Sequence, residues 1–174
     1  DSAYTSTRIT TQGKIEFKYG RLEARAKIPT GQGVWPAIWL LGSNISEVGW
    51  PRCGEIDVLE YVGKEPGRIF TTLHTQDSYG NSVNTKKTSI ADIENGFHIY
   101  AMEWDPEKIR FFVDGEPVYT FAPQERTEEV WPFDQPFYLI LNLAIGGKFG
   151  GPQIDDSIFP QEFVIDYLRV YEID

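Results

Sequence analysis

Three acidic residues, Glu55, Asp57 and Glu60, lie close together in an otherwise largely apolar stretch, residues 53–63. Its β-branched and aromatic content and the glycines at its ends predict a β-strand. Alternate side chains of a strand share a face, so Glu55 and Asp57 point the same way. A regular strand would turn Glu60 toward the apolar face, where an unpaired charge costs several kcal/mol. We therefore predict a β-bulge at residues 58–59, which returns Glu60 to the face of the other two acids.

The spacing of the two glutamates decides which chemistry they can perform. With the bulge, they lie about four strand steps apart, roughly 13 Å at the backbone. Retaining glycoside hydrolysis needs its two carboxyls about 5 to 5.5 Å apart, a gap that long side chains can close across a concave sheet. We therefore predict that Glu55 is the nucleophile, that Asp57 modulates it, and that Glu60 is the general acid/base. The alternative interpretation is a solvated acidic face.

The elements that would position this strand are also predicted to be strands. Residues 20–28 alternate between apolar and charged side chains, which is typical of a half-exposed strand. Asp114 and Gly115 indicate a hairpin turn. Helical periodicity is nowhere sustained, apart from a turn at 155–159. The sequence predicts an all-β sandwich of two antiparallel sheets in a single domain, 1–174, with further strands at 34–41, 68–76, 81–89, 97–104, 108–113, 117–121, 137–145 and 163–171.

Composition limits the partners of the protein. The formal net charge of −10 disfavours nucleic acid, anionic membrane and heavily sulfated polysaccharide, which would all be repelled. Cys53 is the only cysteine, so no disulfide forms within the chain, and we expect it to be a small buried residue. The two histidines, His74 and His98, lie far apart in the sequence without a cysteine cluster, which disfavours zinc. No apolar run reaches membrane-spanning length, and the sequence begins at Asp1 without a signal peptide.

Several segments together resemble glycoside hydrolase family 16, in its laminarinase-like branch with the bulged acidic motif. They span nearly the whole chain in the order of that family: KYGRLEAR (18–25), GVWPAIW (33–39), WPRCGEIDVLEYVG (50–63), HIYAMEW (98–104), FVDG (112–115) and DYLRVY (166–171). The resemblance implies a jelly-roll sandwich with a concave substrate cleft. It further implies a retaining endo-hydrolase of β-1,3-glucan or mixed β-1,3-1,4-glucan that needs no catalytic cofactor.

The resemblance and the residue types suggest which side chains bind the glycan. Trp35 and Trp50 are expected to line the cleft by resemblance, whereas spacing alone leaves the role of each tryptophan open. Arg8 matches a cleft arginine of laminarinase-like members, although it could also be a surface charge. His74 could lie beside the acids and tune Glu60, or be a structural histidine. Asn142 could hydrogen-bond a sugar hydroxyl from a neighbouring strand.

Two departures from the family pattern bear on these expectations. Lys148, Phe149 and Gly150 stand where many relatives have Trp-Pro, which leaves one stacking contact open. The opening strands of the family are absent before Tyr4, so an N-terminal fragment or a second chain is expected to supply them. Asp166 matches a ligand of the family's structural calcium, whose other ligands usually come from those opening strands. The resemblance also implies a secreted protein.

Other functions remain open at this point. A non-catalytic β-glucan-binding module could use the same sandwich, but it would not need all three acids. A transglycosylase would use the same residues and differ only in whether sugar or water resolves the intermediate. A hydrolase of another polysaccharide, such as agar, is a further alternative.

Overall fold

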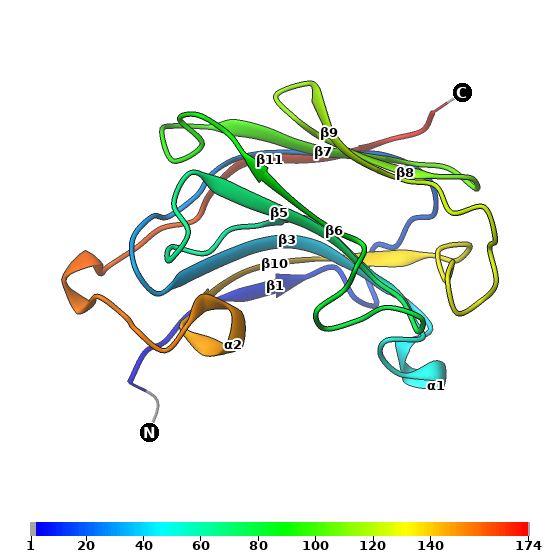
Figure 1. The fold of residues 1–174 in the computed structure, drawn as a ribbon, viewed down its shortest axis with the longest axis horizontal. Coiled ribbons are helices and arrows are strands. Elements are labelled where there is room, and N and C mark those ends of the chain that lie inside the picture. Colours follow the sequence, from blue (N-terminus) through cyan, green and yellow to red (C-terminus); the bar gives the residue numbers. More distant parts are fainter. Residues whose placement is uncertain (1–2, 174) are drawn as a thin grey trace.

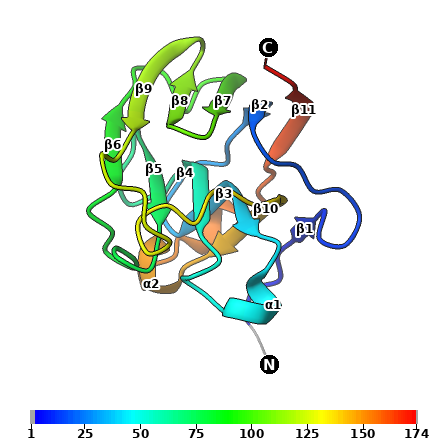
Figure 2. The same cartoon turned by 90° about the vertical axis from the view of Figure 1, so that its right-hand side faces the viewer.

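A computed structural model, which describes residues 3–173, forms two antiparallel β-sheets packed face to face (Figure 1). The six-stranded sheet has the order β1-β10-β3-β4-β5-β6, and the five-stranded sheet has the order β11-β2-β7-β8-β9. Figure 2 shows the strands of the first sheet as a curved row beneath the second. The predicted all-β sandwich is therefore confirmed.

The strand bounds agree with most of the expected ranges. The six-stranded sheet contains β1 (Arg8–Thr10), β3 (Val34–Gly42), β4 (Glu55–Glu60), β5 (Arg68–His74), β6 (Thr85–Ser89) and β10 (Phe137–Ile145). The five-stranded sheet contains β2 (Gly20–Lys27), β7 (His98–Trp104), β8 (Ile109–Val113), β9 (Glu116–Phe121) and β11 (Val164–Tyr171). Strand β1 was not predicted. It has only three residues, all exposed, which is too short to show an alternation of apolar and polar side chains, and it forms by pairing with β10.

Three short helical turns complete the chain. They are α1 (Ile45–Val48), α2 (Gly147–Gly150) and the 3-10 turn Asp156–Ile158, which lies within the predicted turn at 155–159. Helix α2 follows β10 directly and lies under the six-stranded sheet in Figure 1. No helix in residues 3–173 is both long and apolar enough to span a membrane.

The core lies between the sheets and follows the predicted alternation. Leu22, Ala24 and Ala26 of β2 are fully buried, whereas the charged residues between them are partly exposed. Trp104, Tyr100 and other large buried side chains fill the space opposite β4. Burial of this apolar surface is the main favourable contribution to folding, at about 25 cal/mol per Å². It also fixes which face of β4 points away from the core.

The predicted bulge lies in β4. Its pairing with β3 shifts by one residue between Leu59, opposite Ile38, and Asp57, opposite Trp39. The pairing with β5 shifts in the same interval, so β4 has one more residue there than either neighbour. Val58 and Leu59 both pack into the core as a result. Glu60 is thereby returned to the face of Asp57, as expected from the cost of burying its charge.

Candidate functional site

The register of the six-stranded sheet places the three acids in three adjacent rows on its outer face. Glu55 lies between Leu41 and His74, Asp57 between Trp39 and Thr72, and Glu60 between Ala37 and Phe70. The Glu60 row continues through Asn142 to Arg8 at the sheet edge. Residues that are far apart in the sequence therefore meet because antiparallel pairing brings them opposite one another.

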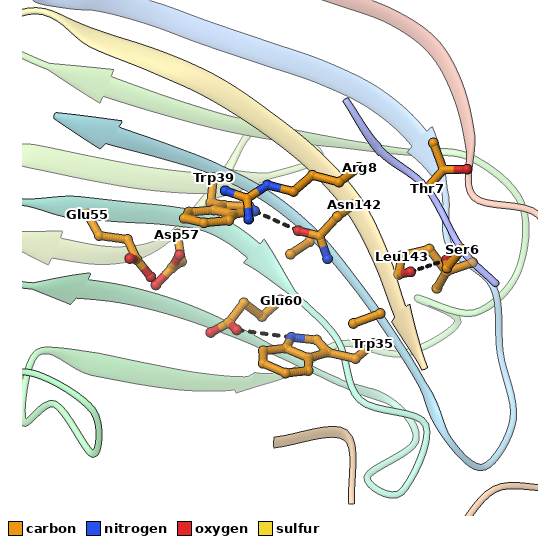
Figure 3. A pocket seen from close by; sticks show the side chains of 12 residues that line it. Ser6, Thr7, Arg8, Trp35, Trp39, Glu55, Asp57, Glu60, Asn142 and Leu143 are labelled. Carbon is orange, nitrogen blue, oxygen red and sulfur yellow. Dashed lines mark hydrogen bonds between the residues drawn. The ribbon is translucent and has the colours of Figure 1, made fainter. Parts of the chain in front are cut away.

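These rows form the floor of a cavity with a volume of ≈ 470 Å³. Figure 3 shows Glu55 and Asp57 facing each other at one side, Glu60 nearby, and Trp35, Trp39, Arg8 and Asn142 around them. The remaining lining residues are Ser6, Thr7, Ala37, Leu143 and Ala144. The small side chain of Ala37, between Asn142 and Glu60, leaves space in front of the glutamate.

Each glutamate accepts a hydrogen bond from a tryptophan. Trp50 Nε1 donates to Glu55 Oε2 at 2.8 Å, and Trp35 Nε1 donates to Glu60 Oε1 at 3.1 Å (Figure 3 shows the second). The sequence predicted both tryptophans near the cleft but not as donors to the acids. The strand register would have indicated the Trp35 contact. Trp35 lies two residues before Ala37, which pairs with Glu60, so Trp35 and Ala37 share the face of Glu60.

Burial raises the pKa of all three carboxyls. For Glu55 burial is the largest cause, followed by the charge of Asp57, and the pKa rises to about 8. Burial also raises the pKa of Asp57, which shares a hydrogen bond with Glu55. Burial and then the charge of Asp57 raise the pKa of Glu60 well above its usual value. A shared carboxyl–carboxyl hydrogen bond requires one proton, so Glu55 and Asp57 hold a proton between them.

The contacts of the two carboxyls differ. Glu55 accepts from Trp50 and has His74 Nε2 at 3.7 Å from its Oε1. Asp57 is only 3% exposed, and its Oδ2 has no hydrogen-bond partner among the described residues. The Trp50 donor favours the charged form of Glu55, whereas burial, the charge of Asp57 and the hydrogen bond with Asp57 raise the Glu55 pKa. The proton therefore belongs to the pair, which carries one negative charge.

His74 contacts a different acid from the one expected. Its Nε2 lies 3.4 Å from Asp57 Oδ2 and 3.7 Å from Glu55 Oε1, whereas we expected it to tune Glu60. The register pairs His74 with Glu55 and Phe70 with Glu60, so the nearest carboxyls to His74 are Asp57 and Glu55. His74 lies beside the acids as expected, and its charge also lowers the pKa of Glu60.

The predicted glycan-binding residues fall into two groups. Arg8 and Asn142 lie with Trp39 at one side of the cavity: the Arg8 guanidinium lies 4.9 Å from the Trp39 ring centroid, and Trp39 Nε1 donates to Asn142 Oδ1 at 2.7 Å (Figure 3). Trp50 is 46% exposed beside Glu55, with its ring against His74 and Tyr79. Their roles in binding stay predictions.

Phe149 is a residue whose role the sequence did not indicate. Its ring meets Trp35 edge-on, with centroids 5.4 Å apart, and meets Phe70 with centroids 5.0 Å apart. It therefore supports the indole that donates to Glu60. The sequence could not indicate this contact, because it depends on where α2 returns beneath β3.

The other two predictions about individual residues concern Cys53 and Asp166. Cys53 is fully buried, as expected, and burial raises its pKa to about 11. Asp166 lies in β11, and its carboxylate is paired with Arg25 at 2.6 Å. The only group of three or more metal-ligating side chains in residues 3–173 is Glu55, Asp57 and His74, so Asp166 belongs to no such group there. Calcium at Asp166 stays a prediction that needs ligands from elsewhere.

Comparison with known proteins identifies the family. Residues 2–167 match the family described as glycosyl hydrolases family 16. The chain is 44% identical to a beta-glucanase of Rhodothermus marinus, covering 97% of this chain and 62% of that protein. Its structure resembles the crystal structure of a laminarinase from Flavobacterium sp. UMI-01, with a TM-score of 0.94 and 65% sequence identity. The match covers 95% of this chain and 72% of that one.

A third relative has a name that implies no catalysis. The chain is 35% identical to a beta-1,3-glucan-binding protein of Penaeus monodon, covering 84% of this chain and 48% of that protein. These matches show that the chain belongs to glycoside hydrolase family 16, as its motifs suggested. It spans less than two thirds of the length of both curated relatives.

Proposed function

We propose that the protein is a retaining endo-glycoside hydrolase that cleaves β-1,3-glucan or mixed β-1,3-1,4-glucan. The observation that carries this proposal is the row of three carboxyls on the cavity floor, with a tryptophan donor on each glutamate. A laminarinase and a beta-glucanase among the relatives support the substrate class. The acidic net charge supports a neutral polysaccharide.

The environments of the acids support the following roles. In the first step, a Glu55 carboxylate oxygen bonds to the anomeric carbon while the glycosidic oxygen leaves with the proton of Glu60. In the second step, Glu60 takes a proton from water, the water oxygen bonds to the anomeric carbon, and the bond to Glu55 breaks. One proton held by the Glu55–Asp57 pair leaves the pair with a single negative charge. Two inversions at one carbon give net retention.

The test of the mechanism is the configuration of the first product. Hydrolysis of laminarin followed by proton NMR should show the β-anomer at the new reducing end before mutarotation. Initial release of the α-anomer would mean direct attack by water and would contradict the nucleophilic role of Glu55. Parallel digestion of laminarin, lichenan and agarose identifies the linkage, and added sugar acceptors measure transglycosylation. Binding of laminarin without any cleavage would favour a glucan-binding function, as in the Penaeus monodon relative.

We also propose that the protein acts outside the cell. A glucan polymer is too large to reach an enzyme inside an intact cell, which supports this location. Fractionation of a producing culture would test it: activity confined to washed, lysed cells would contradict it.

We further propose that an additional N-terminal segment completes the β1 edge, where Ile9 is 61% exposed. Intact-mass measurement with a search for a co-purifying fragment tests that expectation.

A further inference from the structure

The cluster formed by Glu55, Asp57 and His74 has the spacing of a metal site. One oxygen of each carboxylate and one imidazole nitrogen all lie within 4.8 Å of one another. His74 Nε2 is 3.4 Å from Asp57 Oδ2 and 3.7 Å from Glu55 Oε1. In a tetrahedral zinc site, bonds of about 2.0 to 2.2 Å place the ligand atoms roughly 3.3 to 3.5 Å apart. The two distances from His74 Nε2 differ from this by a few tenths of an ångström at most.

A second observation points to a missing cation. Asp57 Oδ2 faces His74, is buried, and has no hydrogen-bond partner among the described residues. A buried carboxylate oxygen without a hydrogen-bond donor loses hydration, and the 3.4 Å contact with His74 compensates this only when the imidazole is charged. A dication between this oxygen and the imidazole would satisfy it and would offset the repulsion from Glu55 and Glu60.

The backbone already holds the three ligands in place. Glu55 and His74 are direct partners across β4 and β5, and Asp57 lies one row away on the same face. Little side-chain freedom is therefore lost on binding. Two carboxylates and one imidazole suit zinc and similar transition metals, whereas calcium and magnesium prefer oxygen ligands alone.

We propose that Glu55, Asp57 and His74 bind one divalent transition-metal ion, Zn²⁺ fitting best, and that the bound ion reversibly inhibits the enzyme. Inhibition rests on the proposed function, because the ion would engage the carboxylate that must attack the anomeric carbon. Binding itself does not rest on it. His74 Nδ1 is buried without a partner in residues 3–173, and the missing partner lowers metal affinity by about 10- to 100-fold. The site is therefore regulatory rather than permanently occupied.

Binding is tested without substrate, by calorimetry and thermal melting of the whole chain with ZnCl₂. One equivalent should bind and raise Tm, and CaCl₂ or MgCl₂ at the same concentration should not. His74→Gln should weaken binding at least tenfold. His98→Gln is the matched control, since His98 is the only other histidine and contacts Asp114 instead; it should bind Zn²⁺ as the unmodified chain does. Glu60→Gln, which removes a neighbouring acid outside the cluster, should also retain binding.

Equal zinc binding by the unmodified chain and His74→Gln would overturn the site, as would loss of binding in His98→Gln alone. If His74→Gln does not fold, Asp57→Asn makes the same test. Inhibition is measured separately, as laminarin hydrolysis against Zn²⁺ and its recovery with EDTA. Activity that persists when the calorimetric site is full would overturn the inhibitory role and leave the proposed function intact. A chain that binds Zn²⁺ but hydrolyses no glucan would contradict the proposed function alone.

Discussion

Glu55 and Glu60 lie at opposite ends of the acid row and make similar contacts in different surroundings. Each accepts one hydrogen bond from an indole N–H. Glu55 also shares a hydrogen bond with Asp57 and lies beside His74, and its donor, Trp50, is 46% exposed. Among the described contacts, Glu60 has only Trp35, whose ring meets Phe149, which in turn meets Phe70.

The difference explains how two residues of the same type can have different roles. A carboxyl with several polar neighbours can ionise in the folded protein, and one with a single neutral donor and apolar support keeps its proton. Glu55 is thereby suited to attack and Glu60 to donate a proton. The following predictions test this comparison.

The largest effect is expected from removing each acid. Glu55→Gln and Glu60→Gln should each lower kcat on laminarin by roughly 10²- to 10⁴-fold with the fold unchanged, because each removes a reacting group. Azide should distinguish them. It should restore turnover of an activated aryl glycoside in both variants, giving an α-glycosyl azide with Glu55→Gln and a β-glycosyl azide with Glu60→Gln. The same azide configuration from both variants would contradict the separate roles.

Removing each tryptophan donor should shift opposite limbs of the pH profile. Both hydrogen bonds lower the pKa of the glutamate that accepts them. Trp50→Phe should therefore move the acid limb of kcat/KM upward, and Trp35→Phe should move the alkaline limb upward. Each shift should be about one to two pH units, since a hydrogen bond to a charge contributes about 1.5 to 3 kcal/mol and one pKa unit is about 1.4 kcal/mol. Shifts of the same limb in both variants would show that the assignment is wrong.

Phe149 should affect the Glu60 end alone. Phe149→Ala removes the ring that supports Trp35, so kcat should fall by roughly two- to tenfold, the range for an aromatic pair. The alkaline limb should move while the acid limb stays. Phe149→Leu, which keeps most of the apolar volume, is the matched control and should lose less. A change in KM alone would instead indicate that Phe149 acts on substrate binding.

The smallest effect concerns stability. When the pKa of a carboxyl is raised in the folded state, its contribution to stability is complete at pH values below its usual pKa of 4.5. That contribution is lost as the pH rises toward the pKa of the folded state. Glu60→Gln should therefore match the unmodified chain near pH 4 and exceed it by pH 7. Each pKa unit corresponds to about 1.4 kcal/mol, or roughly 3 to 6 °C in Tm. Thermal melting from pH 4 to 8 measures this.

Two other glutamates provide controls for that experiment. Glu55→Gln should gain less than Glu60→Gln, because Glu55 has more partners in its charged form. Glu23 should show the opposite sign, since the Tyr167 hydroxyl lowers its pKa. Glu23→Gln should therefore lose stability above pH 4.5 relative to the unmodified chain. Equal slopes for Glu55→Gln and Glu60→Gln would remove the contrast between the two ends of the row.

The sequence alone was sufficient to predict that the three acids share one face, because the evidence for it is local. The period of a strand and the cost of burying a charge leave a bulge as the simplest way to align Glu60 with Glu55 and Asp57. The same reasoning predicted the buried face of β2 and most strand bounds. These properties depend on neighbours a few residues apart, so they can be read from the chain.

The partners of each acid were decided only by the tertiary structure. His74 lies beside Glu55 because β5 pairs with β4 in that register, and Trp39 meets Asn142 and Arg8 because β10 and β1 pair in that order. Phe149 reaches Trp35 only after the chain turns back at α2. Such contacts join residues separated by tens of positions or more, and strand order, which no local pattern encodes, selects them.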